Sequence, residues 1–174
     1  GSGSSCRSFY SPWCVWKTDC GEPIEIPYKE LHHMVLLLDK EKKEVSSSDA
    51  HKRVTTSPLF SKRMVMIQER FESLIQSLKN KSWVQARQIC GVEFEEMHQL
   101  FETSEPSFSY RSSKTFEVLQ LLLEWEKNKE NAPLITMDAG SNIHLLFRPE
   151  DKELAEAYAQ NLKSLEMMLS WSLS

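Results

Sequence analysis

Apolar residues recur at two different periods along the chain, and these periods divide it into strands and helices. Residues 34–38 form a continuous apolar run, which is typical of a central strand covered on both faces. His32 and His33 precede this run, and we expect them at the strand edge with no nearby ligand partner. Two shorter apolar pieces, residues 14–17 and 24–26, are separated by a loop and indicate two short strands.

Between residues 59 and 165, apolar residues recur at steps of three and four, which predicts amphipathic helices. The first spans about residues 59–78. The second begins at a cap, Ser82, the third begins at Ser112 or Ser113, and the last begins at Pro149. A shorter helix is expected over residues 49–54, and residues 167–174 should extend the last helix or fray.

Two apolar runs flank a turn of small residues between residues 134 and 147. The first run ends at Asp138, residues 139–142 form the turn, and the second run continues to residue 147, so the pattern predicts a hairpin. The hairpin presents a carboxylate beside Gly140, where backbone N–H groups can face a ligand. An ordinary turn, in which Asp138 only accepts a local backbone hydrogen bond, stays open.

The order of these elements predicts the fold class. A strand, clustered helices, a hairpin and a closing helix indicate an α+β fold with a small, mostly antiparallel sheet and helices packed on one face. The split β-α-β order suggests a ferredoxin-like arrangement. A length of 174 residues suits one domain with a real core.

Composition excludes several function classes. With 21 basic and 25 acidic residues the net charge is -4, so the chain has no electrostatic footprint for nucleic acid or an anionic membrane. We see no signal peptide or bilayer-spanning run and expect a cytoplasmic protein with reduced thiols. The four cysteines show no metal spacing with the histidines, so no metal-binding residue is predicted. A pairing of Cys14 with Cys20 stays open.

The chain opens on small residues, Gly1-Ser-Gly-Ser-Ser-Cys-Arg-Ser. Serine hydroxyls and free N–H groups at a helix start suit anionic oxygens, and Arg7 can supply a bidentate fork to a carboxylate or phosphate. An expression remnant or a disordered linker would also explain the small residues. The aromatic residues that follow favour burial instead: Phe9, Tyr10, Trp13 and Trp16.

Three separated segments resemble one family, the mevalonate diphosphate decarboxylases of the GHMP kinase superfamily. Residues 1–8 resemble its Gly-Ser-Gly-Ser-Ala-Cys-Arg-Ser motif, and residues 136–142 resemble its Thr-Met-Asp-Ala-Gly-Pro-Asn motif. Residues 45–49 and 56–59 resemble its Val-Ser-Ser and Thr-Ser-Pro-Leu segments. Weaker likeness, which includes His98, extends to about residue 165. Ser141 replaces the family's proline, and Ser48 stands where some bacterial members carry arginine.

The resemblance implies that residues 1–174 are the C-terminal domain of a longer enzyme. Residues 1–30 would form the junction that carries the first motif, and an N-terminal ATP-binding domain would lie upstream. The implied reaction is the ATP- and Mg²⁺-dependent decarboxylation of 5-diphosphomevalonate to isopentenyl diphosphate, in the mevalonate pathway of isoprenoid biosynthesis. The isolated chain would be inactive, and homodimers are common in the family.

The resemblance also implies roles for individual residues. Asp138 would take or orient the proton of the substrate's 3-hydroxyl group, and Arg7 would bind the substrate carboxylate. Ser2 and Ser4 would hydrogen-bond substrate oxygens, and Ser47 would contact the nucleotide phosphates. Gly140, which belongs to the implied substrate-binding residues, would permit the close turn beside Asp138.

Two alternatives stay open. The first is a related superfamily enzyme, such as a mevalonate 3-kinase or a phosphomevalonate decarboxylase. A pure kinase has no need of a carboxylate-binding arginine, so Arg7 together with Asp138 favours a decarboxylase. The second is a non-enzymatic helical interaction module, in which the hairpin turn is only structural.

Overall fold

The computed structural model describes residues 12–16, 20–38, 45–127, 129–165 and 168–172. Short 3-10 turns lie at Val54–Thr56 and Pro149–Asp151. The strands and helices, in chain order, are β1 (Cys14–Trp16), β2 (Gly21–Pro23), β3 (His32–Leu37), α2 (Ser47–Arg53), α3 (Phe60–Lys79), α4 (Trp83–Glu102), α5 (Ser113–Glu126), β4 (Leu134–Met137), β5 (Ile143–Phe147), α6 (Lys152–Ser164) and β6 (Met168–Ser172).

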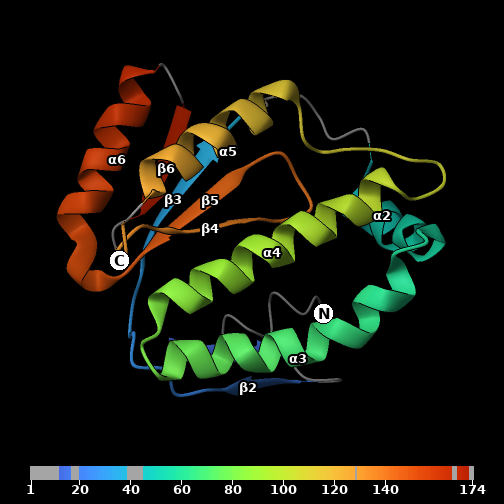
Figure 1. Cartoon of the computed structure of the whole chain (residues 1–174), viewed down its shortest axis with the longest axis horizontal. Coiled ribbons are helices and arrows are strands. Elements are labelled where there is room, and N and C mark those ends of the chain that lie inside the picture. The colour runs from blue at the N-terminus through green and yellow to red at the C-terminus, as the bar shows by residue number, and fades with distance from the viewer. Residues whose placement is uncertain (1–11, 17–19, 39–44, 128, 166–167, 173–174) are drawn as a thin grey trace.

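Four strands form an antiparallel sheet in the order β4-β5-β3-β6. The chain leaves β3, passes through the helices, returns as the β4–β5 hairpin and closes through α6 into β6 (Figure 1). This is the split β-α-β order of a ferredoxin-like sheet. The predicted α+β class, with a small antiparallel sheet and the helices on one face, is confirmed.

The main core lies between the sheet and the helices α5 and α6. Met34 and Leu36 of β3 are fully buried there, whereas the alternate residues of β3 are half-buried on the opposite face. The second face of β3 is therefore only partly covered, not fully covered as the apolar run suggested. The other core residues include Val118, Leu122, Ile143, Leu145, Phe147, Tyr158 and Leu162.

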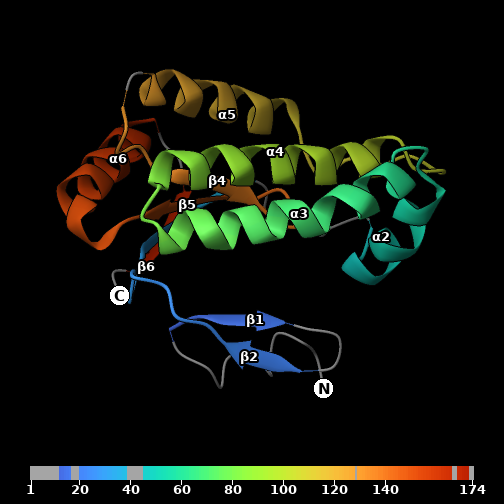
Figure 2. The same ribbon diagram turned by 60° about the horizontal axis from the view of Figure 1, so that its bottom comes forward.

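The helices α3 and α4 form a second layer beside the sheet. In both views α4 runs between α5 and α3 (Figures 1 and 2), and it also packs along β4. Figure 2 shows the β1–β2 pair and α5 on opposite sides of this layer. The segment after β2 packs there through Tyr28, whose ring lies edge-on to Trp83 with centroids 5.5 Å apart.

The structure corrects the sequence-based strands near both ends of the described chain. The second short strand is Gly21–Pro23 and not residues 24–26, because Val15 pairs with Glu22 and Ile26 is instead buried against the α3–α4 layer. The helix α6 ends at Ser164, and residues 168–172 pair with β3 as β6 instead of extending the helix or fraying.

His32 and His33 lie within the central strand β3 and not at a sheet edge. His32 is buried, and its Nε2 lies 3.1 Å from the carbonyl oxygen of Pro149. His33 has a ring partner on the neighbouring strand, because its Nε2 lies 2.9 Å from Nδ1 of His144. Burial and then His144 lower the pKa of His33. His33 therefore has a ring partner that the sequence did not indicate.

The helix caps follow the sequence only in part. Ser112 is the N-cap of α5, and together with Thr115 it forms a capping box, as the sequence allowed. Ser82 is the N-cap of α4, but its side chain makes no capping hydrogen bond. Within the described ranges no helix is both long and apolar enough to cross a membrane.

Candidate active site

Asp138 follows directly after β4, at the turn of the β4–β5 hairpin, and its side chain is exposed. Met137 and Ile143 pair across the hairpin, so the turn comprises residues 138–142 and includes Asp138 in addition to the predicted residues 139–142. The N–H of Gly140 donates to the carbonyl oxygen of Asp138 at 2.8 Å and is therefore directed within the turn, not toward a ligand. None of the described glycines has a left-handed φ, so the turn does not use that freedom of Gly140.

His98 anchors the turn from the neighbouring helix α4. Its side chain is fully buried, and its Nε2 lies 3.1 Å from the carbonyl oxygen of Asp138. A carbonyl oxygen only accepts, so Nε2 carries the proton and Nδ1 is the acceptor nitrogen. Burial and then the Arg111 guanidinium lower the pKa of His98, although the hydrogen bond to Asp138 opposes them. The neutral ring therefore fixes the main chain at Asp138.

Tyr110 connects the hairpin turn to the segment that precedes α2. Its hydroxyl donates to the carbonyl oxygen of Val45 at 2.9 Å, and its ring lies edge-on to Phe101. Burial and then the Asp138 carboxylate raise the pKa of Tyr110. The acid and the phenol are thus close enough to interact electrostatically. Ala139 packs on the same apolar cluster, which contains Val45 and Phe101.

Ser47 is the first residue of α2, and its side chain is exposed. The cap before it is Ser46, whose hydroxyl accepts from the N–H of Asp49 at 3.1 Å and donates to its carboxylate at 2.7 Å. Ser47 and Asp138 make no direct hydrogen bond in the described chain. They belong to two segments that Tyr110 joins, because Val45 lies two residues before Ser47.

The described ranges place both signs of charge beside Tyr110. The guanidinium of Arg53, at the end of α2, lies 5.4 Å from the centroid of the Phe108 ring. Its positive charge lowers the pKa of Tyr110, whereas the carboxylates of Asp138 and Asp49 raise it. No cluster of three or more histidine, cysteine, aspartate or glutamate side chains that would hold a metal ion occurs among these residues. Neither Tyr110 nor Arg53 was expected at this site from the sequence.

Three of the site residues expected from the sequence, Ser2, Ser4 and Arg7, lie outside the described residues. Asp138, Gly140 and Ser47 are described, and the first two share the hairpin turn. His98 makes one hydrogen bond, from Nε2 to the turn, and its buried Nδ1 has no hydrogen-bond partner among the described residues. Tyr110 and Arg53 carried no local signal, because their proximity to Asp138 arises only from the tertiary fold.

Three cysteine thiols are free in the described structure: Cys14, Cys20 and Cys90. The open pairing of Cys14 with Cys20 is therefore not formed. Burial, and then the nearby Glu93 carboxylate, raise the pKa of Cys90 to about 12, so this thiol is a poor nucleophile at neutral pH.

Comparisons with known proteins place this turn and its supporting helix in a characterised family. The model of the mevalonate 5-diphosphate decarboxylase C-terminal domain matches residues 33–169. The diphosphomevalonate decarboxylase of Ganoderma lucidum is 25% identical, with 90% of this chain and 44% of the relative covered. That of Danio rerio is 26% identical, with 82% and 39% covered. The chain therefore spans less than half the length of these curated relatives.

Solved structures share the fold over nearly the whole chain. The mevalonate diphosphate decarboxylase from Legionella pneumophila is 39% identical with a TM-score of 0.91, and the match covers 97% of this chain and 54% of that one. A structure of MDDEF in complex with MVAPP, AMPPCP and magnesium is 22% identical with a TM-score of 0.83. That match covers 99% of this chain and 58% of the other, and at this identity it shows the fold alone.

Proposed function

Because the chain belongs to the family of the mevalonate 5-diphosphate decarboxylase C-terminal domain, we propose that it is the C-terminal part of an ATP-dependent diphosphomevalonate decarboxylase. The full enzyme would convert 5-diphosphomevalonate to isopentenyl diphosphate and release ADP, phosphate and carbon dioxide. The observation that supports this most strongly is an exposed acid, Asp138, whose main chain is fixed by the buried His98. An exposed side chain on a fixed backbone is suited to act on a bound substrate.

The domain organisation is part of the proposal. Residues 1–174 would form the C-terminal domain, with residues 1–30 as the junction, and an N-terminal ATP-binding domain would precede them. The relatives from Ganoderma lucidum and Danio rerio support this division, since the chain covers less than half of each. The isolated domain should be inactive, because the nucleotide loop would lie in the missing half.

In the first step, Asp138 would act on the 3-hydroxyl group of the substrate. The hydroxyl oxygen would form a bond to the γ-phosphorus while the bond from that phosphorus to ADP breaks, and the hydroxyl proton would pass toward the Asp138 carboxylate. The surroundings of Tyr110 hold the positive charge of Arg53 as well as the negative charges of Asp49 and Asp138. Asp138 would therefore be both proton acceptor and orienting group.

In the second step, the carbon–carbon bond to the carboxylate would break. Its electron pair would form the new double bond as the phosphorylated 3-oxygen leaves, which releases phosphate and carbon dioxide. Arg7 would hold the carboxylate in a bidentate fork and fix the direction of its departure. Ser2 and Ser4 would hydrogen-bond other substrate oxygens, and the buried Gly140 would keep the turn close beside Asp138.

ATP and Mg²⁺ are the small molecules that this proposal requires. Ser47 would contact the nucleotide phosphates through its exposed hydroxyl. Mg²⁺ takes oxygen ligands, and the nucleotide phosphates offer such oxygens. Because the described residues form no three-ligand cluster, phosphate oxygens would supply most of the coordination. When bound, the ion would offset charge on the phosphates; the MDDEF complex with AMPPCP and magnesium supports this use.

The deciding experiment measures carbon dioxide, phosphate and ADP released from ATP and 5-diphosphomevalonate by the full-length gene product. Asp138→Asn should lower turnover by several orders of magnitude, and Glu156→Gln, at an exposed position on α6, is the matched control. ADP formed without carbon dioxide would make the protein a kinase. No reaction in the wild-type protein would support an interaction module instead.

Two further properties belong to the same proposal. A cytoplasmic location fits the free thiol of Cys20, because exposed thiols persist in reducing compartments. A homodimer is the expected assembly of the full-length protein. Sedimentation velocity at several concentrations tests the assembly, and a constant monomer mass would contradict it.

A further inference from the structure

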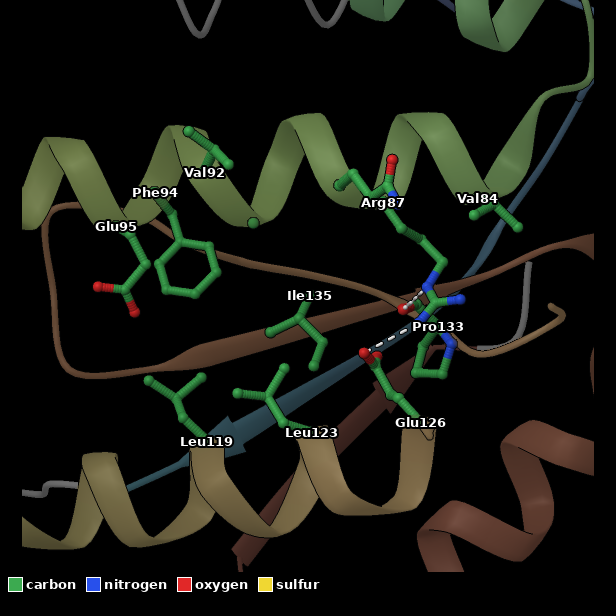
Figure 3. A pocket seen from close by; sticks show the side chains of 12 residues that line it. Val84, Arg87, Val92, Phe94, Glu95, Leu119, Leu123, Glu126, Pro133 and Ile135 are labelled. Carbon is green, nitrogen blue, oxygen red and sulfur yellow. Dashed lines mark hydrogen bonds and ion pairs between the residues drawn. The ribbon is translucent and has the colours of Figure 1, made fainter. Parts of the chain in front are cut away.

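A groove of about 420 Å³ separates α4 from α5 and lies over β4 (Figure 3). Its apolar surface is formed by Phe94, Leu119, Leu123 and Ile135, which point into it from three elements. The groove contains none of the residues of the hairpin turn around Asp138. Its volume is in the range of small-molecule sites, and such sites combine an apolar lining with a few polar groups.

One end of the groove is polar and carries an ion pair. Arg87 Nη2 lies 2.9 Å from Glu126 Oε2, and both side chains are nearly buried. The other nitrogens of Arg87 are also used, because Nε donates to the Pro133 carbonyl at 3.2 Å and Nη1 donates to the Lys129 carbonyl at 3.0 Å. The guanidinium is thus held in place by the protein itself.

The second carboxylate oxygen of Glu126 has no such partner. Oε1 is buried and accepts no hydrogen bond from the residues that the structure describes. A buried acceptor without a donor is costly, so the open position at this end calls for a group that donates. A ligand anion would offer only acceptors here, so it could not satisfy Oε1.

The charges that line the groove are held in ion pairs, and among the described residues only Oε1 of Glu126 is buried there without a partner. Glu95 lines the other end, as Figure 3 shows, and its Oε2 lies 2.6 Å from Nη1 of Arg111. Burial raises the pKa of Glu126, while Arg87 partly opposes this. A positively charged group beside Oε1 would stabilise the ionised carboxylate and make a charge-assisted hydrogen bond.

Gly91 keeps the groove open at the middle of α4. Glycine destabilises a helix interior relative to alanine, so its presence there needs a reason. A Cβ built on Gly91 would meet no atom within 4 Å, which shows that close packing with the described chain does not demand glycine. The missing side chain instead leaves room for an occupant next to the helix backbone.

We propose that the α4–α5 groove binds a small amine with an apolar body. The ammonium group would donate to Oε1 of Glu126, and the apolar body would lie on Phe94, Leu119 and Ile135 beside Gly91. This site is separate from the one around Asp138, and it stands whether or not the decarboxylase assignment holds.

The test is isothermal titration of the full-length protein with three compounds of one skeleton and different head groups. Phenylpropylamine should bind with a Kd on the order of 10⁻⁴ M, which is reasonable for a ligand of this size. Phenylpropanol, which has a neutral donor, should bind at least roughly tenfold more weakly, because charge-assisted hydrogen bonds are about twice as strong as neutral ones. Phenylpropanoate should not bind, because its carboxylate cannot donate a hydrogen bond.

Three variants locate the site. Glu126→Gln should weaken phenylpropylamine binding by roughly tenfold or more, whereas Glu124→Gln, an exposed control on the same helix, should not change it. Gly91→Leu should fill the groove and abolish binding while the thermal midpoint is kept or raised. This variant keeps the test valid if Glu126→Gln fails to fold.

Three results would overturn the proposal. The first is equal affinity for the amine and the alcohol, and the second is unchanged amine binding in both Glu126→Gln and Gly91→Leu. The third is a change in sedimentation of Gly91→Leu without ligand, which would make the groove a protein interface. Decarboxylase turnover is measured on the same samples, so failure of that assignment remains distinguishable from failure of the amine site.

Discussion

Replacing His98 with leucine should damage catalysis far more than folding. The variant removes the hydrogen bond from Nε2 to the Asp138 carbonyl, which is 3.1 Å long, while leucine fills a similar buried volume. The carbonyl keeps its hydrogen bond from Gly140, so the net loss should be about 1 kcal/mol in the free energy of unfolding. A turn that shifts by about 1 Å misplaces the acid and costs roughly 100-fold in turnover.

The same substitution should change how stability depends on pH. The pKa of His98 is lowered in the folded protein by burial first and by Arg111 second. The unfolded chain therefore binds a proton at higher pH than the folded one. Stability is kept above the unfolded value of about 6.5 and is lost as the pH falls below it, with a slope of up to about 1.4 kcal/mol per pH unit.

Urea unfolding at several pH values between about 5 and 8 measures this slope, and steady-state decarboxylation measures turnover. His98→Leu should lose its share of the slope, while His33, whose pKa is also lowered, retains its own share. His51→Leu, at an exposed position on α2, is the control and should change neither quantity. Wild-type turnover in His98→Leu, or an unchanged pH slope, would refute the anchoring role.

Three other changes test the structure away from the turn. Arg111→Met should cost about 1–3 kcal/mol in urea unfolding, because the nearly buried guanidinium donates to both carboxylate oxygens of Glu102, which is itself partly exposed. An unchanged free energy of unfolding would contradict this. Cys90, with a pKa raised to about 12, should react with maleimide far more slowly than the exposed Cys20 at pH near 8. Mass spectrometry of timed samples measures the two rates, and similar rates would be inconsistent with the burial of Cys90. Gly91→Ala should raise the free energy of unfolding by up to about 1 kcal/mol, and a decrease would show that the groove cannot accept a methyl group.

Sequence patterns predicted the elements whose causes are local. The β4–β5 hairpin follows from two apolar runs and a small-residue turn, and Met137 pairs with Ile143 as that spacing requires. The capping box of Ser112 and Thr115 is likewise encoded within four residues. In these places the residues that determine the structure are neighbours in the chain.

The wrong predictions lie where a distant partner decides the structure. Residues 168–172 become β6 because the edge of β3 offers them hydrogen bonds, with Val35 opposite Ser170. Nothing within the tail itself requires a strand. Similarly, the choice of Gly21–Pro23 over residues 24–26 reflects the register with β1 and the burial of Ile26 against α3 and α4.

The acid shows how these two kinds of cause combine in one site. A local motif is sufficient to predict that Asp138 lies in a turn, but the direction of its backbone depends on His98, which is 40 residues away in the chain. Tyr110 lies in the same cluster as the turn and donates a hydrogen bond to Val45, which is 65 residues before Tyr110 in the chain. Because buried contacts of this kind come only from the packing of α2, α4 and the hairpin, a variant that loosens this packing should impair Asp138 even when the motif itself is intact.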